Sequence, residues 1–249
     1  MKVQAIKTTL RKIRAFRSLF LQESNFQFVY NKCHAYGWAD TYLFMLDGAA
    51  VGYGSVWGQN NRSDRDAIFE FYVVKPYRKF AGECFLKLWE ASGAVCVECQ
   101  SNDVLLTAML YQYSKNINAE NLLFDDHFQT QIILPGISFH QQEAKENDRR
   151  DEFKYYLKQE DEDEEEEVVV ATGGLMLNYN EPFADLYMEV KDGFRKQGLG
   201  SFMIQELKKA CYLMGRVPGA RCNIDNAASK ATLLKAGMKV CGYILTGKL

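Results

Sequence analysis

Residues 195–201 combine positive charge with a flexible main chain, and this combination is suited to binding a phosphate group. The sequence reads Arg-Lys-Gln-Gly-Leu-Gly-Ser. Gly198 and Gly200 have no Cβ, so the backbone can approach an anion closely. Arg195 and Lys196 add two full positive charges next to the glycines. The segment therefore predicts a seat for a phosphate or diphosphate.

The elements on either side of this segment would position it. Residues 184–190 alternate apolar and polar side chains, which predicts a strand. Residues 199–214 repeat apolar side chains at helical spacing and stop before Gly215, a residue type that often follows a helix. The basic loop would then end at a helix N-terminus, where free N–H groups and the helix dipole favour an anion.

Two nucleotide-binding motifs fit the loop poorly. A dinucleotide fingerprint requires a third glycine where this chain has Met203. A P-loop requires Gly-Lys followed by Ser or Thr, and the loop lacks this order.

The spacing Gln197-Gly198-Leu199-Gly200 behind a strand resembles the Arg/Gln-x-x-Gly-x-Gly/Ala motif of the GNAT superfamily of acyl-CoA N-acyltransferases. Residues 225–238 then run from Asp-Asn-Ala-Ala-Ser to Leu-Lys-Ala-Gly-Met, as a second helix, and a strand-like segment follows. This order is similar to the second half of a GNAT domain. The resemblance covers residues 150–249.

The resemblance implies that acetyl-CoA is the co-substrate and that no metal takes part. The cofactor-binding residues that it implies are Val190, Arg195, Lys196, Gln197, Gly198, Leu199, Gly200, Ser201 and Asn226. The backbone near Val190 would bond the pantetheine arm and the thioester oxygen. Asn226 would bond the pantetheine arm, and a role as helix N-cap is equally compatible with its position.

Two carboxylates are candidates for the catalytic base. Asp185 and Glu189 lie on the same face of the expected strand 184–190, opposite its apolar face. An alkylammonium acceptor costs about 4–5 kcal/mol to deprotonate at pH 7, so a base is needed. Glu189 is the first candidate because it adjoins Val190, and Asp185 is the second. A surface or salt-bridged carboxylate is the alternative interpretation of both.

The family often places a tyrosine in the last helix as a general acid, whereas this chain has Leu233 and Leu234 at the matching positions. A thiol with a pKa of about 8.5 leaves as a thiolate at modest cost, so activity does not require that tyrosine.

The first half of the chain repeats the order of the second half, with a period of about 120 residues. Expected strands are 41–46, 50–57, 67–74 and 94–99, and expected helices are 5–21, 82–92 and 103–114. Asp47-Gly48 predicts a hairpin turn, and Ser101 or Asn102 is the expected N-cap of the helix at 103–114.

The first copy differs where the second has its basic glycine loop. Residues 80–84 read Phe-Ala-Gly-Glu-Cys, so both motif glycines are displaced. Glu83 would repel a phosphate by about 1 kcal/mol or more at close range. The first copy is therefore predicted not to hold acyl-CoA and to serve structure or acceptor recognition.

The predicted fold class is α/β, with a mixed sheet of the α+β type. The chain is expected to form two tandem GNAT-like modules. Each module would be a central twisted, mostly antiparallel sheet flanked by helices. The predicted domains are a degenerate module at 1–133, a linker at 134–150 and an acetyl-CoA-binding module at 151–249. The second module lacks the two helices that usually follow the first strand of a GNAT domain, and the first module is the expected source of the rest of its acceptor pocket.

Composition limits the remaining function classes. The net charge is −2, and without the eight acids at 160–167 it would be −2 + 8 = +6, a mildly basic body that suits an anionic cofactor. The acidic run itself is interpreted as a solvated hairpin tip or as a polyamine-attracting site. The basic residues are not concentrated enough to predict nucleic-acid binding. The apolar runs are too short to predict a membrane span. Seven scattered cysteines, including the lone pair Cys96 and Cys99, suggest reduced thiols in a cytoplasm rather than disulfides or metal sites.

The sequence thus predicts an N-acetyltransferase, an acyltransferase that moves acetyl directly from acetyl-CoA to a primary amine. A small-molecule amine is the expected acceptor, and the oligomeric state is open. The alternatives are a non-catalytic acyl-CoA-binding or regulatory GNAT-like protein and a protein-binding scaffold.

Overall fold

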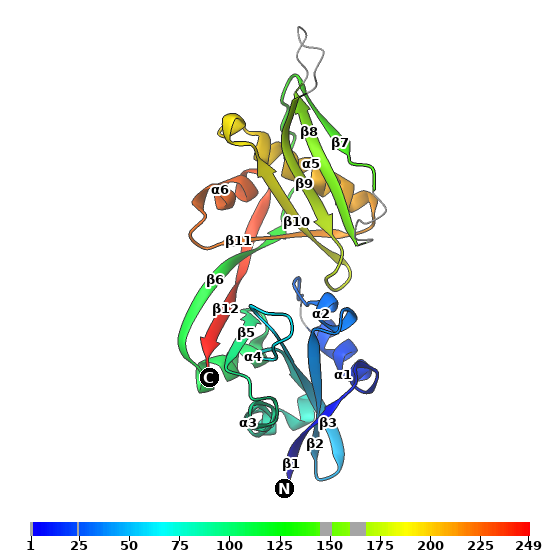
Figure 1. Ribbon diagram of the computed structural model, residues 1–249, viewed down its shortest axis with the longest axis vertical. Helices are drawn as coiled ribbons and strands as arrows, with labels where there is room; N and C mark the ends of the chain where they lie inside the picture. Colours follow the sequence, from blue (N-terminus) through cyan, green and yellow to red (C-terminus); the bar gives the residue numbers. More distant parts are fainter. Residues whose placement is uncertain (1, 24, 145–150, 160–167) are drawn as a thin grey trace. The chain divides into compact units, whose positions relative to one another are not determined.

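The computed structural model describes residues 2–23, 25–144, 151–159 and 168–249, and contacts divide the chain into two compact units (Figure 1). Unit 1 comprises Met1–Phe26, Tyr30–Glu120 and Gly242–Leu249, and unit 2 comprises Gln27–Val29 and Asn121–Cys241. Two long strands, β6 (Lys115–Asp126) and β12 (Met238–Lys248), each begin in one unit and end in the other.

Unit 1 is a sheet with helices. Its other elements are β1 (Val3–Thr8), α1 (Leu10–Glu23), α2 (Asn31–Ala35), β2 (Ala39–Leu46), β3 (Ala49–Trp57), β4 (Ala67–Val73), the 3-10 helix η1 (Lys75–Phe80), α3 (Ala81–Ser92), β5 (Cys96–Gln100) and α4 (Val104–Tyr113). The strand order is β1-β2-β3-β4-β5-β12-β6. Strands β4 and β5 are parallel, and β5 pairs antiparallel with the end of β12.

Unit 2 repeats this order with fewer helices. Its other elements are β7 (Ile137–Gln141), β8 (Glu152–Gln159), β9 (Val168–Met176), β10 (Phe183–Val190), the 3-10 helix η2 (Asp192–Phe194), α5 (Leu199–Leu213), β11 (Val217–Asn223) and α6 (Ala227–Lys235). The strand order is β12-β6-β11-β10-β9-β8-β7. None of the described residues between β7 and β8 is helical.

The mixed sheet flanked by helices agrees with the predicted fold class. The hairpin of β2 and β3 forms as expected, because Asp47 and Gly48 both take the left-handed conformation that its turn requires. The eight acids at 160–167 lie outside the described residues, although β8 and β9 pair on both sides of them.

Four local expectations are wrong or incomplete. Residues 5–8 belong to β1, which pairs with β2 along its whole length, so the first helix starts at Leu10. Asp103, and not Ser101 or Asn102, is the N-cap of α4, because its carboxylate accepts from the N–H of Leu106. Strand β6 was also not predicted by the sequence analysis.

Part of the expected linker, Ile137–Gln141, is strand β7. The contacts therefore divide the chain differently from the predicted limits of 1–133, 134–150 and 151–249.

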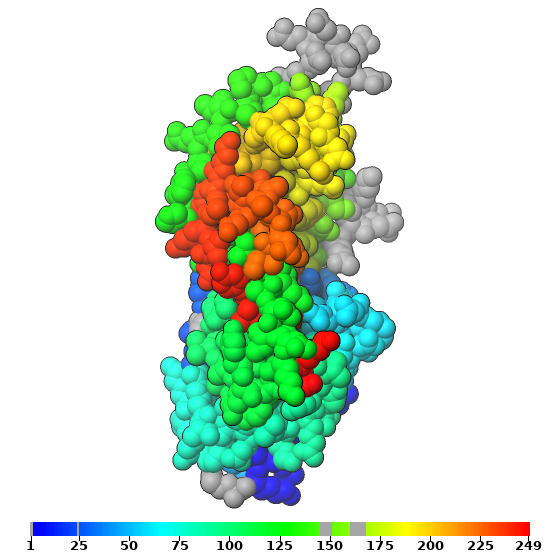
Figure 2. Space-filling model, turned by 90° about the vertical axis from the view of Figure 1, so that its left-hand side faces the viewer, coloured from blue at the N-terminus to red at the C-terminus, as the bar shows by residue number. Residues whose placement is uncertain are grey.

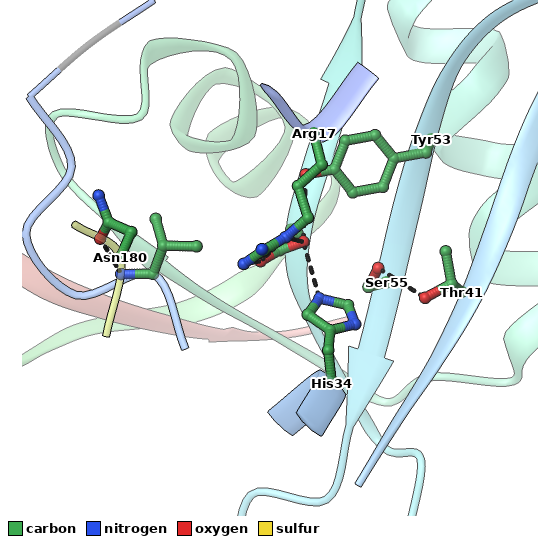
Figure 3. A network of polar contacts seen from close by, with 8 residues as sticks. Arg17, His34, Thr41, Tyr53, Ser55 and Asn180 are labelled. Carbon is green, nitrogen blue, oxygen red and sulfur yellow. Dashed lines mark hydrogen bonds and ion pairs between the residues drawn. The ribbon is translucent and has the colours of Figure 1, made fainter. Parts of the chain in front are cut away.

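One buried carboxylate ties four elements of unit 1 together (Figure 3). Glu70 of β4 accepts from Arg17 of α1 at 2.8 Å, from Tyr53 of β3 at 3.1 Å and lies 3.1 Å from Nε2 of His34 in α2. Burial alone would raise the pKa of Glu70, but the charges and hydrogen bonds of Arg17 and His34 outweigh it and hold the pKa well below its ordinary value. The ionised Glu70 therefore fixes both helices on the sheet.

All seven cysteines are free thiols, and burial raises the pKa of each of them, which disfavours the thiolate form. None of the described helices combines the length and the apolar character needed to cross a bilayer. Among the described residues, no group of three His, Cys, Asp or Glu side chains is arranged to hold a metal ion.

Candidate functional site

Strand β10 has a free edge over its second half. Its parallel pairing with β11 extends only from Phe183 to Leu186. Its antiparallel pairing with β9 continues to Val190. Met188, Glu189 and Val190 therefore have a strand neighbour on one side only. Their backbone groups on the other side are available to a ligand.

A cavity of about 630 Å³ lies at this free edge, within unit 2. Its lining residues are Met188, Glu189, Val190, Phe194, Arg195, Lys196, Gly198, Leu199, Gly200, Ser201, Asn226, Ala228, Ser229 and Thr232. The cavity brings together every predicted cofactor-binding residue except Gln197, which is not among its lining residues. Of the two predicted catalytic residues, it includes Glu189 and not Asp185.

The loop before α5 has the conformation that its glycines allow. Gly198 is the N-cap of α5 and takes a left-handed conformation with φ of 86°, and Lys196 is also left-handed with φ of 65°. The N–H groups of the first helical turn, at Leu199, Gly200 and Ser201, have no partner within a helix. All three residues line the cavity, so these N–H groups can bind an anion there.

Gly200 is required by the close approach of its neighbours. A Cβ at this position would lie 3.0 Å from Cγ2 of Thr232 and 3.1 Å from Cε of Met188. Both neighbours line the same cavity. The glycine therefore keeps open a space that any larger side chain would fill.

The two cations of the loop differ in their surroundings. Arg195 is 2.7 Å from the carboxylate of Asp192 and donates from Nε to the carbonyl of Val190 at 3.3 Å. These contacts hold the guanidinium against the end of β10, although the exposed ion pair itself contributes little stability. Among the described residues, none forms an ion pair with Lys196.

The two candidate bases lie in different environments. Glu189 is exposed and lines the cavity. Asp185 is only 2% exposed and lies 3.3 Å from Nη2 of Arg221 on β11, which also donates to the hydroxyl of Tyr179 at 2.5 Å. This buried ion pair favours a structural role for Asp185 and leaves Glu189 as the better placed carboxylate.

Asn226 begins the second helix of the site. Its side-chain oxygen accepts from the N–H of Ser229 at 2.9 Å, so it is the N-cap of α6. The amide NH2 of the same side chain is then the group that can reach a ligand in the cavity. Further along α6, Leu233 is 3% exposed in the core and Leu234 is 43% exposed, so neither position carries an acid.

Sequence reasoning missed two polar side chains that fix α5. Gln205 accepts from the N–H of Ile132 at 2.6 Å and donates to its carbonyl at 3.0 Å. The buried Lys208 donates to the carbonyl of Phe128 at 2.7 Å and pairs with Asp126 at 2.8 Å. These bonds hold the segment after β6 against α5. The sequence feature that could have revealed them is the presence of a glutamine and a lysine on the otherwise apolar face of α5.

The matching region of unit 1 has another structure. The 3-10 helix η1 runs directly into α3, and the N–H of Ala81 is bonded to the carbonyl of Arg78. A Cβ on Gly82 would lie 2.7 Å from the hydroxyl of Tyr113, and Glu83 occupies the first turn of α3. The described residues before α3 therefore form no glycine loop, and the loss of acyl-CoA binding by unit 1 stays a prediction.

Comparison with known proteins agrees with this description. Residues 119–238 match the profile of the Acetyltransferase (GNAT) family. A search of curated proteins found no match.

Several solved structures are similar over nearly the whole chain. An acetyltransferase of the GNAT family from Colwellia psychrerythraea is 15% identical, with a TM-score of 0.76 over 100% of both chains. A GCN5-related N-acetyltransferase from Sphaerobacter thermophilus is 12% identical, with a TM-score of 0.59 over 99% of this chain and 95% of that one. A tandem GNAT protein from the clavulanic acid biosynthesis pathway is 9% identical, with a TM-score of 0.57 over 99% and 98%.

Residues 119–238 thus belong to the GNAT family, and the chain as a whole has the fold of tandem GNAT proteins. Acetyl transfer is the activity that this family and fold support in general.

Proposed function

We propose that unit 2 transfers an acetyl group from acetyl-CoA to a primary amine of a small-molecule acceptor. The observation that carries this proposal is the shared cavity. The first turn of α5 and the free end of β10 line the same space of about 630 Å³. An anion-binding helix start therefore adjoins backbone groups that can hold an extended chain.

The residues of the cavity fit the parts of acetyl-CoA. The N–H groups of residues 199–201 and the charge of Lys196 suit the diphosphate. The free edge of β10 near Val190 suits the amide groups of the pantetheine arm, and Asn226 adds a side-chain donor. The space kept by Gly200 suits a diphosphate that touches the backbone.

The proposed reaction requires one proton transfer by a side chain of the protein. Glu189 takes a proton from the acceptor ammonium, and the free amine nitrogen attacks the thioester carbonyl carbon. The new C–N bond forms as the C–S bond breaks, and coenzyme A leaves as the thiolate. No acid is needed from Leu233 or Leu234, because a thiol with a pKa of about 8.5 leaves readily near neutral pH.

The substitution Gly200→Glu tests the site by copying the acid of unit 1. The added carboxylate would fill the cavity and repel the diphosphate, so we expect affinity for acetyl-CoA to fall by about a hundredfold or more. Isothermal calorimetry measures the affinity, and the melting temperature reports whether the fold is kept. Glu83→Gln in unit 1 is the matched control, with unchanged affinity expected. Equal binding by Gly200→Glu and the wild type would rule this site out.

A thiol-release assay with a panel of amines tests the reaction itself. The proposal predicts release of coenzyme A that depends on both an amine and Gly200. Binding of acetyl-CoA without release on any amine would instead favour the non-catalytic acyl-CoA-binding alternative.

A further inference from the structure

Lys235 lies beside the glycine loop of unit 2, although it belongs to another helix. A Cβ placed on Gly198 would lie 3.9 Å from Nζ of Lys235 and 3.8 Å from Cδ2 of Leu134. The ammonium group therefore reaches the N-cap of α5, where the free N–H groups of the loop begin.

The side of α6 that meets the cavity ends at Lys235. Ala228 and Thr232 both line the cavity, and Lys235 follows them at a spacing of four and then three residues. Residues at this spacing share one face of a helix. The side chain of Lys235 is exposed, and Figure 2 shows the orange-red atoms of this part of the chain at the surface.

The charge of Lys235 is available to a ligand. Arg195 is already paired with Asp192, whereas no residue in the described part of the chain forms an ion pair with Lys235. The lysine adds positive charge at the last turn of α6, next to the loop that carries Lys196. Lys196 lines the cavity, and Lys235, which is not among the lining residues, approaches the same glycine loop from α6.

We propose that Lys235 binds a phosphate group of the acyl-CoA donor and is a further cofactor-binding residue. This inference rests on the proposed function of unit 2. The phosphate is either the diphosphate or the 3′-phosphate of the adenosine, and both present the same anionic oxygens to an ammonium group.

The test compares Lys235→Gln with Lys230→Gln. Both lysines lie on α6, are exposed and carry the same charge, but Lys230 is not on the face that Ala228 and Thr232 share. Calorimetry measures binding of coenzyme A, of 3′-dephospho-coenzyme A and of pantetheine. We expect Lys235→Gln to weaken coenzyme A binding about tenfold and Lys230→Gln to leave it unchanged.

The three ligands identify the phosphate. If 3′-dephospho-coenzyme A loses affinity to the same extent, Lys235 acts on the diphosphate. If only coenzyme A loses affinity, Lys235 acts on the 3′-phosphate. Pantetheine binding should not change, and a matching loss for pantetheine would overturn the proposal, because it carries no phosphate.

The outcomes also separate this inference from the proposed function. If the wild type and Lys235→Gln bind coenzyme A equally well, the proposed role of Lys235 is wrong and the proposed function of unit 2 is unaffected. If the wild type binds no coenzyme A, both the proposed function and the role of Lys235 are wrong. Lys235→Arg keeps the charge and should retain most of the affinity. The difference between Lys235→Gln and the wild type should shrink as salt is added.

Discussion

Glu189 and Asp185 lie four residues apart on β10 and have opposite surroundings. Asp185 is buried against Arg221 and so has a partner for its charge. Glu189 is exposed at the cavity, where an acceptor amine would arrive. A carboxylate that must take a proton and release it again is better placed where water can reach it.

Replacing Glu189 by glutamine should slow acetyl transfer more at pH 7 than at pH 9. The reason is that the fraction of free amine rises about tenfold for each pH unit below its pKa of about 10.4, so a base matters less at high pH. Initial rates across this range, at saturating acetyl-CoA, measure the ratio of variant to wild type. Glu90→Gln, at an exposed position of unit 1, is the control. A ratio that stays constant with pH would remove Glu189 from the role.

Asp103 and Asn226 cap the matching helices of the two units with different chemistry. Each side chain accepts from an N–H three residues later, at Leu106 and Ser229. Asn226 is exposed, whereas Asp103 is buried, and burial raises its pKa to about 7. The negative charges of Glu70 and Glu23 add to this shift. Only the neutral amide therefore caps its helix equally well at every pH.

Asp103→Asn should remove a pH dependence from the stability of unit 1. The folded-state pKa of about 7 lies above the ordinary value of 3.8, so the folded protein binds the proton more tightly. Wild-type stability should therefore fall as the pH rises from about 4 to 7, by up to about 1.4 kcal/mol per unit. The variant keeps the cap and should melt higher than the wild type at pH 8. Equal slopes of melting temperature against pH for the two proteins would contradict this.

At the scale of elements, the two units differ in how the chain enters the helix after the central strand. In unit 2 a loop with left-handed Lys196 and Gly198 leads into α5. In unit 1 the 3-10 helix η1 continues into α3 without such a loop. The same strand-to-helix connection is therefore open to an anion in one copy and used for internal hydrogen bonds in the other.

Strands β5 and β11 each pair with a strand that is distant in sequence. Strand β5 pairs with Ile244–Lys248 of β12, and β11 pairs with residues 121–125 of β6. The strand beside β5 thus follows α6, and the strand beside β11 follows α4. Each unit is completed by a strand from the other repeat.

Deleting residues 242–249 should destabilise unit 1 selectively. Ile244 and Leu245 are buried, and each contributes about 1.5–3 kcal/mol, in addition to the lost pairing with β5. Hydrogen exchange should show lost protection in β5 and retained protection in α5. Leu245→Ala is a milder version, with an expected cost of about 2–5 kcal/mol. Equal loss of protection in both helical layers would mean that the strand does not belong to unit 1 alone.

Much of the fold could be predicted because its signals are local. Asp47 and Gly48 mark a turn, and Gly198 and Gly200 mark the loop, from residue type alone. The pairing of β6 with β11 and of β12 with β5 could not be predicted, because it joins residues that are roughly a hundred or more positions apart in the sequence. The same limit applies to the site, where Lys235 reaches Gly198 only after both helices have packed.

At the scale of the whole molecule, the two compact units do not correspond to two independent stretches of chain. Unit 1 includes Gly242–Leu249 and unit 2 includes Gln27–Val29. A cut between the repeats would therefore take from each unit a segment that it needs.

Separate expression of residues 1–144 and 145–249 should give two incomplete proteins. The first half lacks the strand that pairs with β5, and the second lacks the strand that pairs with β11, so each has an open sheet edge. We expect aggregation or partial folding alone and a one-to-one complex on mixing, measured by light scattering. Acetyl-CoA binding should return only in the mixture. A folded, acetyl-CoA-binding half 145–249 would contradict this expectation.

The crossing of β6 and β12 has an evolutionary consequence. A one-repeat ancestor with this strand arrangement would place its last strand in the sheet of a second copy, so two identical chains would complete each other around a two-fold axis. Fusion of duplicated genes would then convert an obligate homodimer into one polypeptide while keeping every strand pair. In such a fused chain one half could lose its glycine loop while the other half kept one.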